Sequence, residues 1–445
     1  MRVLIGNDFI MQLLEKMLEK TDRLRYVAGE YTPAFFEMKI ATDEPIDVNN
    51  MSREQWSTFF HEYIHFLQDI TTTYGLYHIY AIGEHILSCV HQIKQMPLGN
   101  FDTPIDFEED NQDNVQLQMD LYRLTNGERD DRKQFLNTFN IKRIRNEKKS
   151  LRRNNTIDEV ECVVMETDSG DLHFGAREIM ESMAYLIQRT CFPETPEHYQ
   201  FPYLSAWKVA AHYSKSFAKS NGKVVALCEM SLMASNPGKV FVQIMKSIQS
   251  KRIKFQTTTD VYRYFDALKL FDYQFQINCT IYEAYQNTAR YAFNHLHEYY
   301  QGEERFQDIM DWLARVHDFV LDIRENKRLI FKEIMNGGDV STNQTLREVI
   351  NAVGGPLMKN NKGDYYQFSN TPNLSMIKAV NTIYRDVFRD GVNVCDMHVW
   401  CRRSPNNNAT SDCYLRPWMR SSNAATMCPF SALWRKWGLD GHNPE

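Results

Sequence analysis

Two histidines and a glutamate form the most informative group in this sequence of 445 residues. His61, Glu62 and His65 fit the pattern H-E-x-x-H. If this stretch is helical, residues four apart share one face, so both imidazoles can reach a single metal ion. Glu62 then lies about 100° round the helix from His61, where its carboxylate can take a proton from a water beside the metal. The spacing therefore predicts half of a zinc site together with a general base.

The residues around this pattern predict a buried helix. Ser52 and Gln55 have the spacing of a capping box, which places the start of the helix directly after Ser52. Two imidazoles and a carboxylate are costly in an apolar interior unless they share a partner, and Zn²⁺ would satisfy all three. The alternative is an ordinary buried helix whose histidines are satisfied by hydrogen bonds. The flanking side chains are large and mostly apolar: Trp56, Phe59, Phe60, Tyr63, Ile64, Phe66 and Leu67.

The pattern resembles the active-site helix of the zincin metallopeptidases. In those enzymes the H-E-x-x-H helix supplies two zinc ligands and the general base. The residues that follow His65 here, 66–71, lack the Gly and the third His with which metzincins continue. The resemblance therefore implies the gluzincin arrangement, in which a Glu from a later helix is the third ligand.

Glu181 is the first candidate for that ligand. It lies in a segment with helical periodicity, 175–187, and the four residues from Glu181 to Ala184 are similar to the E-x-x-A segment of gluzincins. Glu178, one turn earlier, could bind the metal instead or could accept a hydrogen bond from a ligand His. Glu283, which precedes a small residue on another predicted helix, is a third alternative.

Later residues supply candidates for stabilising the oxyanion of a tetrahedral intermediate. The alternative for each is a structural role, because aromatic residues at helical spacing usually pack in a core. All of them lie on helices predicted between residues 203 and 336: His212, Tyr213, Tyr282, Tyr285 and Arg290.

Four of the nine cysteines lie close together near the end of the chain. This density indicates a structural zinc site, although no C-x₂-C pair is present. The alternative is a small packed tail without metal. The other five cysteines are dispersed among helical segments, which predicts reduced thiols and a cytoplasmic protein. The candidate ligands of the second site are Cys395, His398, Cys401, Cys413 and Cys428.

The elements that must position these residues predict an α+β fold that is predominantly helical. The pattern of 31–40 predicts a strand, and 157–174 predicts a β-hairpin that leads into the helix of Glu181. The resemblance makes the first strand a candidate for the edge that pairs with an extended substrate. We expect a zincin-like catalytic lobe with a small sheet in residues 1–200, a helical second lobe that closes the cleft in 201–336, and a loop-rich region in 337–445.

Charge and hydropathy exclude some classes of protein. The net charge of -6 gives no reason to expect a nucleic-acid partner for the whole chain. The basic segment 142–153 predicts a solvated helix or loop, with a contact for RNA or an acidic partner as the alternative. No run of about 18 apolar residues predicts a membrane span, and the first residues lack the apolar core of a signal peptide.

Together these patterns predict a zinc-dependent endopeptidase that hydrolyses a specific intracellular protein or peptide. Zinc would activate a water and Glu62 would act as the general base. The alternative function is that of a non-catalytic helical interaction or sensor protein with a structural metal. Replacing Glu62 distinguishes the two, because only the enzyme needs its carboxylate.

Overall fold

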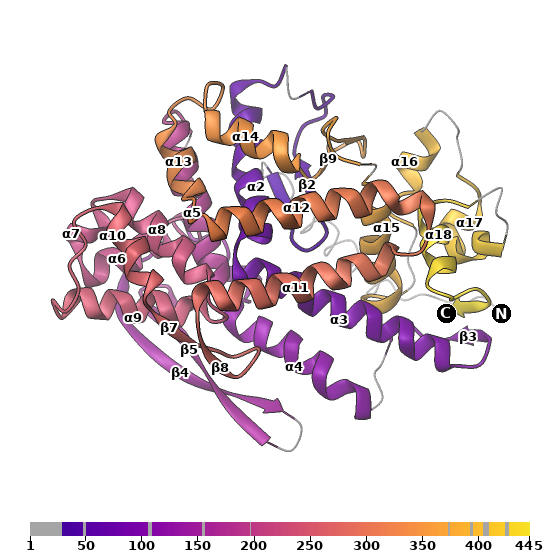
Figure 1. The fold of residues 1–445 in the computed structure, drawn as a ribbon, viewed down its shortest axis with the longest axis horizontal. Coiled ribbons are helices and arrows are strands. Elements are labelled where there is room, and N and C mark those ends of the chain that lie inside the picture. The colour runs from indigo at the N-terminus through magenta and orange to yellow at the C-terminus, as the bar shows by residue number, and fades with distance from the viewer. Residues whose placement is uncertain are drawn as a thin grey trace, which may run out of the picture.

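Helices make up most of the protein (Figure 1). The computed structural model describes residues 29–47, 50–105, 109–153, 156–195, 197–372, 374–391, 395–403, 409–422 and 427–445. The fold is mixed α+β with 56% helix, 14% strand and several small sheets, which confirms the predicted class. Within the described ranges, no helix combines the length and the apolar character needed to cross a membrane.

Helix α2 (Arg53–Thr71) passes through the core of the fold. The predicted capping box is present, because Ser52 Oγ accepts from the amide of Gln55 and Gln55 Oε1 accepts from the amide of Ser52. Every residue of 59–71 is buried, so apolar neighbours surround the helix on all sides. Thr72 ends α2 and also caps α3 (Thr73–Gln95), since its hydroxyl accepts from the amide of Gly75.

A four-stranded sheet lies beside α2. Its order is β1 (Gly29–Thr32), β2 (Glu37–Ile40), β9 (Leu357–Lys359) and β10 (Tyr365–Tyr366), and only β2 and β9 run parallel. The single strand predicted for 31–40 is wrong in part, because a turn divides the segment into β1 and β2. Ala34 and Phe36 adopt φ of 66° and 48° in that turn, which reverses the chain.

A long hairpin projects from the helical body (Figure 1). It consists of β4 (Ile141–Arg153) and β5 (Thr156–Thr167), and β6 (Gly170–Phe174) pairs with the other edge of β5. The hairpin predicted for 157–174 is therefore confirmed as β5 and β6. The basic segment 142–153, however, is a strand rather than a helix or loop. Acidic residues on the neighbouring strands favour this conformation. Lys148 is opposite Glu161 on β5, and Arg145 forms ion pairs with Glu166 on β5 and Asp171 on β6.

The segment predicted to be nearly all helical, 203–336, is confirmed as helices α6 to α13 with one short hairpin. Helices α11 and α12 lie side by side across the molecule, and α3 packs along α11 (Figure 1). The bounds are α6 (Ser205–Tyr213), α7 (Lys215–Ala218), α8 (Asn221–Leu232), α9 (Pro237–Gln249), α10 (Thr258–Asp266), β7 (Lys269–Asp272), β8 (Ile277–Thr280), α11 (Ile281–Tyr300), α12 (Gln307–Glu325) and α13 (Ile330–Asn336).

Nine further helices and strands complete the described part of the fold. They are β3 (Gly99–Phe101), α4 (Glu109–Asn126), α5 (Ala176–Cys191), α14 (Gln344–Val353), α15 (Ser375–Ile383), α16 (His398–Arg403), α17 (Asp412–Leu415), α18 (Pro429–Lys436) and β11 (His442–Pro444). A π-helical turn, Tyr384–Arg389, extends α15. Short 3-10 turns lie at Asp131–Lys133, Glu304–Phe306 and Pro417–Ser422.

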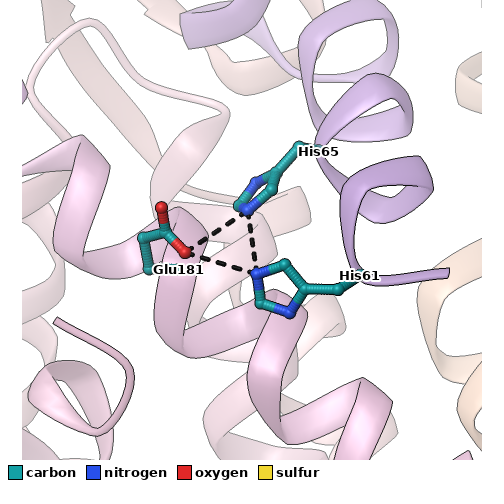
Figure 2. A group of neighbouring side chains, drawn as sticks. All are labelled: His61, His65 and Glu181. Atoms are coloured by element: carbon teal, nitrogen blue, oxygen red, sulfur yellow. Dashed lines mark hydrogen bonds and ion pairs between the residues drawn. The ribbon is translucent and has the colours of Figure 1, made fainter. Parts of the chain in front are cut away.

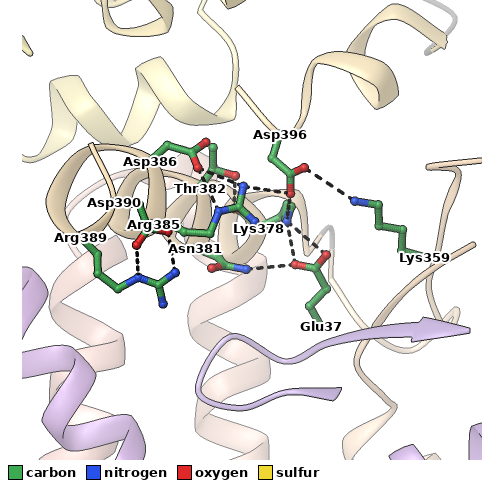
Figure 3. A network of polar contacts seen from close by, with 10 residues as sticks. All are labelled: Glu37, Lys359, Lys378, Asn381, Thr382, Arg385, Asp386, Arg389, Asp390 and Asp396. Carbon is green, nitrogen blue, oxygen red and sulfur yellow. Dashed lines mark hydrogen bonds and ion pairs between the residues drawn. The ribbon is translucent and has the colours of Figure 1, made fainter. Parts of the chain in front are cut away.

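A buried ion network joins the four-stranded sheet to the C-terminal region (Figure 3). Lys378 on α15 lies 2.9 Å from Glu37 Oε2 on β2 and 2.5 Å from Asp396 Oδ2. Asn381, one turn along α15, donates to the same Glu37 oxygen at 3.1 Å. The lysine is 3% exposed and Glu37 is 8% exposed, so the charges are paired where water has little access.

Candidate metal centre

Three side chains from two helices meet at one point (Figure 2). His61 Nε2 lies 3.2 Å from His65 Nε2, and Glu181 Oε2 lies 3.3 Å from the first nitrogen and 3.4 Å from the second. Ligand atoms around a tetrahedral Zn²⁺ are about 3.3 Å apart, given bonds of about 2.0 Å. This largely buried group could hold a metal ion.

The histidines come from one face of α2, as their spacing predicts. Glu181 comes from α5, which starts at Ala176 directly after β6 and packs against α2. Ser182 on α5 fixes the following segment, because its hydroxyl accepts from the amide of Ala206 and donates to the carbonyl of Pro202. The two helices therefore hold ligands that are 120 residues apart in the chain.

Two glutamines orient the imidazole rings. Gln188 Nε2 donates to the carbonyl of Ser57 at 2.9 Å, so its Oε1 faces His61 Nδ1 at 3.1 Å. Gln68 Nε2 donates to the carbonyl of Met180 at 3.0 Å, so its Oε1 faces His65 Nδ1 at 2.8 Å. Each Nδ1 must be the donor, so in each ring it is Nε2 that faces Glu181 and is available to a metal ion.

The charges of the three groups depend on one another. Burial by itself would raise the pKa of Glu181, but the charge of His65 and hydrogen bonds from both histidines hold it well below its usual range. Burial would also lower the pKa of His65, yet the charge of Glu181 and their hydrogen bond raise it to about 9. The carboxylate thus stays ionised and makes the point where the ligands meet attractive to a cation.

Glu62 borders the same cavity, whose volume is about 460 Å³. Its side chain is not part of the group of three ligands, and the residue is 7% exposed. Burial raises the pKa of this carboxyl, while the neighbouring histidines act in the opposite direction. A carboxylate with a raised pKa beside a metal position is suited to accept a proton.

The two alternative glutamates lie elsewhere. Glu178 is fully buried, and its oxygens accept from the backbone amides of Gly175 and Glu128, so it holds the start of α5 in place of binding metal. Burial raises its pKa to about 7. Glu283 is exposed and belongs to the capping box of α11 with Thr280.

None of the five predicted oxyanion residues lines the cavity of the three ligands. Tyr282 donates to Asp266 and Tyr285 to the carbonyl of Ile70. Arg290 lies over the ring of the adjacent Tyr291, and His212 packs edge-on against Tyr213. Their contacts agree with the structural role that was the alternative for each of them.

Tyr203 lines the cavity in their place. Its ring lies edge-on to that of His61, with 5.8 Å between centroids, and burial together with the charges of Glu181 and Glu62 raises its pKa well above the usual range. The hydroxyl therefore stays protonated and can donate. No motif marks Tyr203 in the sequence, whereas Gln68 follows His65 by three residues on the same helix and could have been found from that spacing.

The cysteines predicted as a second site lie in the C-terminal region. Cys395, Cys401, Cys413 and Cys428 are buried, and no cysteine of the chain forms a disulfide. His398 packs against the ring of Tyr414, with 3.9 Å between centroids.

Comparison with known proteins adds no relative. No family model matches the sequence, and neither a curated protein nor a solved structure matches it. The functional argument therefore depends on the residues and the geometry of the site.

Proposed function

We propose that this protein is a zinc-dependent endopeptidase of the gluzincin type, in which His61, His65 and Glu181 bind the metal. The observation that carries the proposal is the meeting of two imidazole nitrogens and a carboxylate oxygen at one point. Glutamines accept from Nδ1 of both rings, so the Nε2 atoms are the ones that face the carboxylate oxygen. A cation between them satisfies all three, and two nitrogens with one oxygen are a donor set that suits Zn²⁺.

Three protein ligands leave one tetrahedral position for water or substrate, as a catalytic zinc requires. Zinc in this position would lower the pKa of a water and polarise the carbonyl of a peptide bond. Glu62 takes the proton of the attacking water and passes it to the leaving nitrogen. Its raised pKa makes it a stronger base than an exposed carboxylate.

The hydroxyl of Tyr203 stabilises the negative charge that develops on the carbonyl oxygen. Support comes from its place on the cavity wall beside Glu181 and Glu62, and from a raised pKa that keeps it a donor. Because it is part of the wall already, it needs no large movement to act.

Strand β1 supports a peptide as the substrate. Within the described residues it pairs only with β2, and Gly29, Glu30 and Tyr31 line the cavity. A Cβ added at Gly29 would come within 2.7 Å of Glu62 Oε1, so β1 passes directly over the general base. An extended peptide that pairs with this edge would carry its backbone past Glu62. In this proposal α2, α5 and the sheet form a zincin-like half, and the later helices form the second lobe.

The test compares zinc content and peptide hydrolysis in matched variants. We expect His61→Ala and Glu181→Ala each to lose about one zinc per chain relative to wild type, while Glu283→Ala keeps it. Glu62→Gln should keep all the zinc and lose about 10²–10⁴-fold in the rate of cleavage of a mixed peptide library. Zinc that is unaffected by His61→Ala would refute the metal site. Equal cleavage patterns for wild type and Glu62→Gln would refute the enzyme and favour the interaction protein.

A further inference from the structure

Four buried thiols lie in the C-terminal region on three short segments of the chain. Cys395 precedes α16 and Cys401 lies within it, Cys413 lies in α17, and Cys428 is the N-cap of α18. The amide of Cys395 donates to the carbonyl of Cys413 at 3.1 Å, which joins the first segment to the second. Each of the four residues is at most 9% exposed. Three segments that are close in sequence thus place four buried thiols at one end of the chain.

The thiols are near enough to influence one another. Burial, and then the charges of Cys428, Cys401 and Cys413, raise the pKa of Cys395. Burial and the charges of Cys428 and Cys413 likewise raise the pKa of Cys401 to about 12. Without a metal these groups would therefore stay neutral thiols.

Hydrogen-bonding groups lie beside two of the sulfurs, those of Cys413 and Cys428. The amide of Thr410 donates to Cys413 Sγ at 3.4 Å, and Cys428 Sγ lies 3.4 Å from the hydroxyl of Ser431 in the first turn of α18. Arg420, which is 5% exposed, donates from Nη1 to Cys413 Sγ at 3.3 Å. Amide and guanidinium donors stabilise sulfur that carries negative charge.

We propose that Cys395, Cys401, Cys413 and Cys428 bind a second zinc ion with four thiolate ligands. Zn²⁺ supplies the positive charge that lets buried sulfurs ionise together, and each thiol releases its proton to solvent on binding. The site is structural, because four protein ligands leave no open position for water. It is separate from the site of His61, His65 and Glu181, which uses none of these residues.

Metal binding must contract the cluster. No three of these sulfurs lie within 4.8 Å of one another in the structure, whereas sulfurs around a tetrahedral zinc are about 3.8 Å apart. Helix α16 has six residues and α17 has four, so both are too short to be stable by themselves. A metal that joins them to α18 would hold this end of the fold together.

His398 is excluded from this set of ligands. Its ring packs on that of Tyr414, with 3.9 Å between the centroids, which occupies a face of the imidazole. The short spacing from Cys395 to His398 reflects the first turn of α16, where the amide of His398 donates to the carbonyl of Cys395. The five-residue set suggested by the sequence therefore reduces to four cysteines.

The experiment uses the full chain with both histidines of the first site replaced, His61→Ala/His65→Ala. We expect this variant to keep about one zinc per chain, and its Co²⁺-substituted form to show the intense near-ultraviolet band of sulfur-to-cobalt charge transfer. Adding Cys401→Ser should lower the metal content and weaken the band. Cys279→Ser, which removes a buried thiol outside the cluster, should change neither.

A second measurement guards against a cysteine variant that fails to fold. In the wild type, a mercurial reagent titrated against the thiols should release one zinc that a weak chelator then binds, while the zinc of the histidine site remains. A His61→Ala/His65→Ala protein that is folded, holds no zinc and gives no sulfur-to-cobalt band would overturn the proposal. That result would leave the metallopeptidase proposal intact, because the two sites share no ligand.

Discussion

Gln188 Oε1 lies 3.1 Å from His61 Nδ1, across an interface between helices whose residues are 127 positions apart. The amide cannot turn round, because Gln188 Nε2 donates to both the carbonyl and the hydroxyl of Ser57. This contact makes Nδ1 of His61 the donor and turns Nε2 toward Glu181. The orientation of a candidate metal ligand is therefore decided by a residue that would not contact the metal.

Gln188→Met removes that acceptor and keeps the length of the side chain. We expect zinc affinity at the histidine site to fall about 10–100-fold, because the imidazole loses the partner that orients it. Competition with a fluorescent chelator, in protein carrying Cys401→Ser to simplify the stoichiometry, measures the change. Gln92→Met, which replaces a buried glutamine on α3 outside the cavity, is the control and should leave affinity unchanged. Equal affinities of wild type and Gln188→Met would show that His61 is oriented by other contacts.

Tyr203→Phe tests the proposed oxyanion donor. Losing one such donor lowers kcat by about 10²–10³-fold with little change in KM, because the hydrogen bond forms only in the transition state. Steady-state kinetics on a peptide cleaved by the wild type provides the measurement. Tyr213→Phe is the matched control, since that tyrosine lies outside the cavity and should keep wild-type kcat. A reduced kcat in Tyr213→Phe with normal Tyr203→Phe would reverse the assignment.

Because His78 is buried, we expect the folded protein to lose stability in mild acid. It stacks flat on Tyr122, with 4.2 Å between ring centroids, and burial lowers its pKa from 6.5 to about 4. Below pH 6.5 the unfolded chain binds a proton that the folded protein excludes, so stability falls as the pH drops toward 4. The pKa shift corresponds to about 3 kcal/mol.

His78→Phe keeps a stacked ring and removes the titrating group. Urea unfolding between pH 4 and pH 7 should therefore show a shallower dependence on pH for the variant than for wild type. A parallel dependence in the two proteins would mean that His78 is protonated in the fold. The comparison is made between proteins at each pH, so acid effects on the metal sites cancel to first order.

Lys378→Met tests the buried network that ties β2 to the C-terminal region (Figure 3). The substitution leaves Glu37 and Asp396 without their buried cation, and breaking such a pair costs about 3–5 kcal/mol. Lys359→Met is the control, because its pairing with Asp396 is longer, at 3.7 Å, and more exposed, so its cost should stay below about 1 kcal/mol. Urea midpoints measure both, and equal losses would show that burial does not set the strength of this pair.

The local parts of the site could be predicted from the sequence. The i, i+4 spacing of His61 and His65 and the capping box of Ser52 and Gln55 depend on contacts within a few residues, which a helix repeats in every protein. The hairpin 157–174 follows equally from alternation and turn residues. The basic strand β4 does not, because its conformation depends on acidic partners in β5 and β6.

By itself the sequence determined a buried helix that presents two imidazoles and a carboxylate, and hence the class of metal that could bind there. Only the tertiary structure decided that Glu181 meets them while Glu178 and Glu283 cap helices, and that Tyr203 lines the cavity. The physical reason is the sequence distance over which the interactions act. Spacing along a helix sets which residues share a face, whereas packing between helices far apart in the chain sets which faces meet.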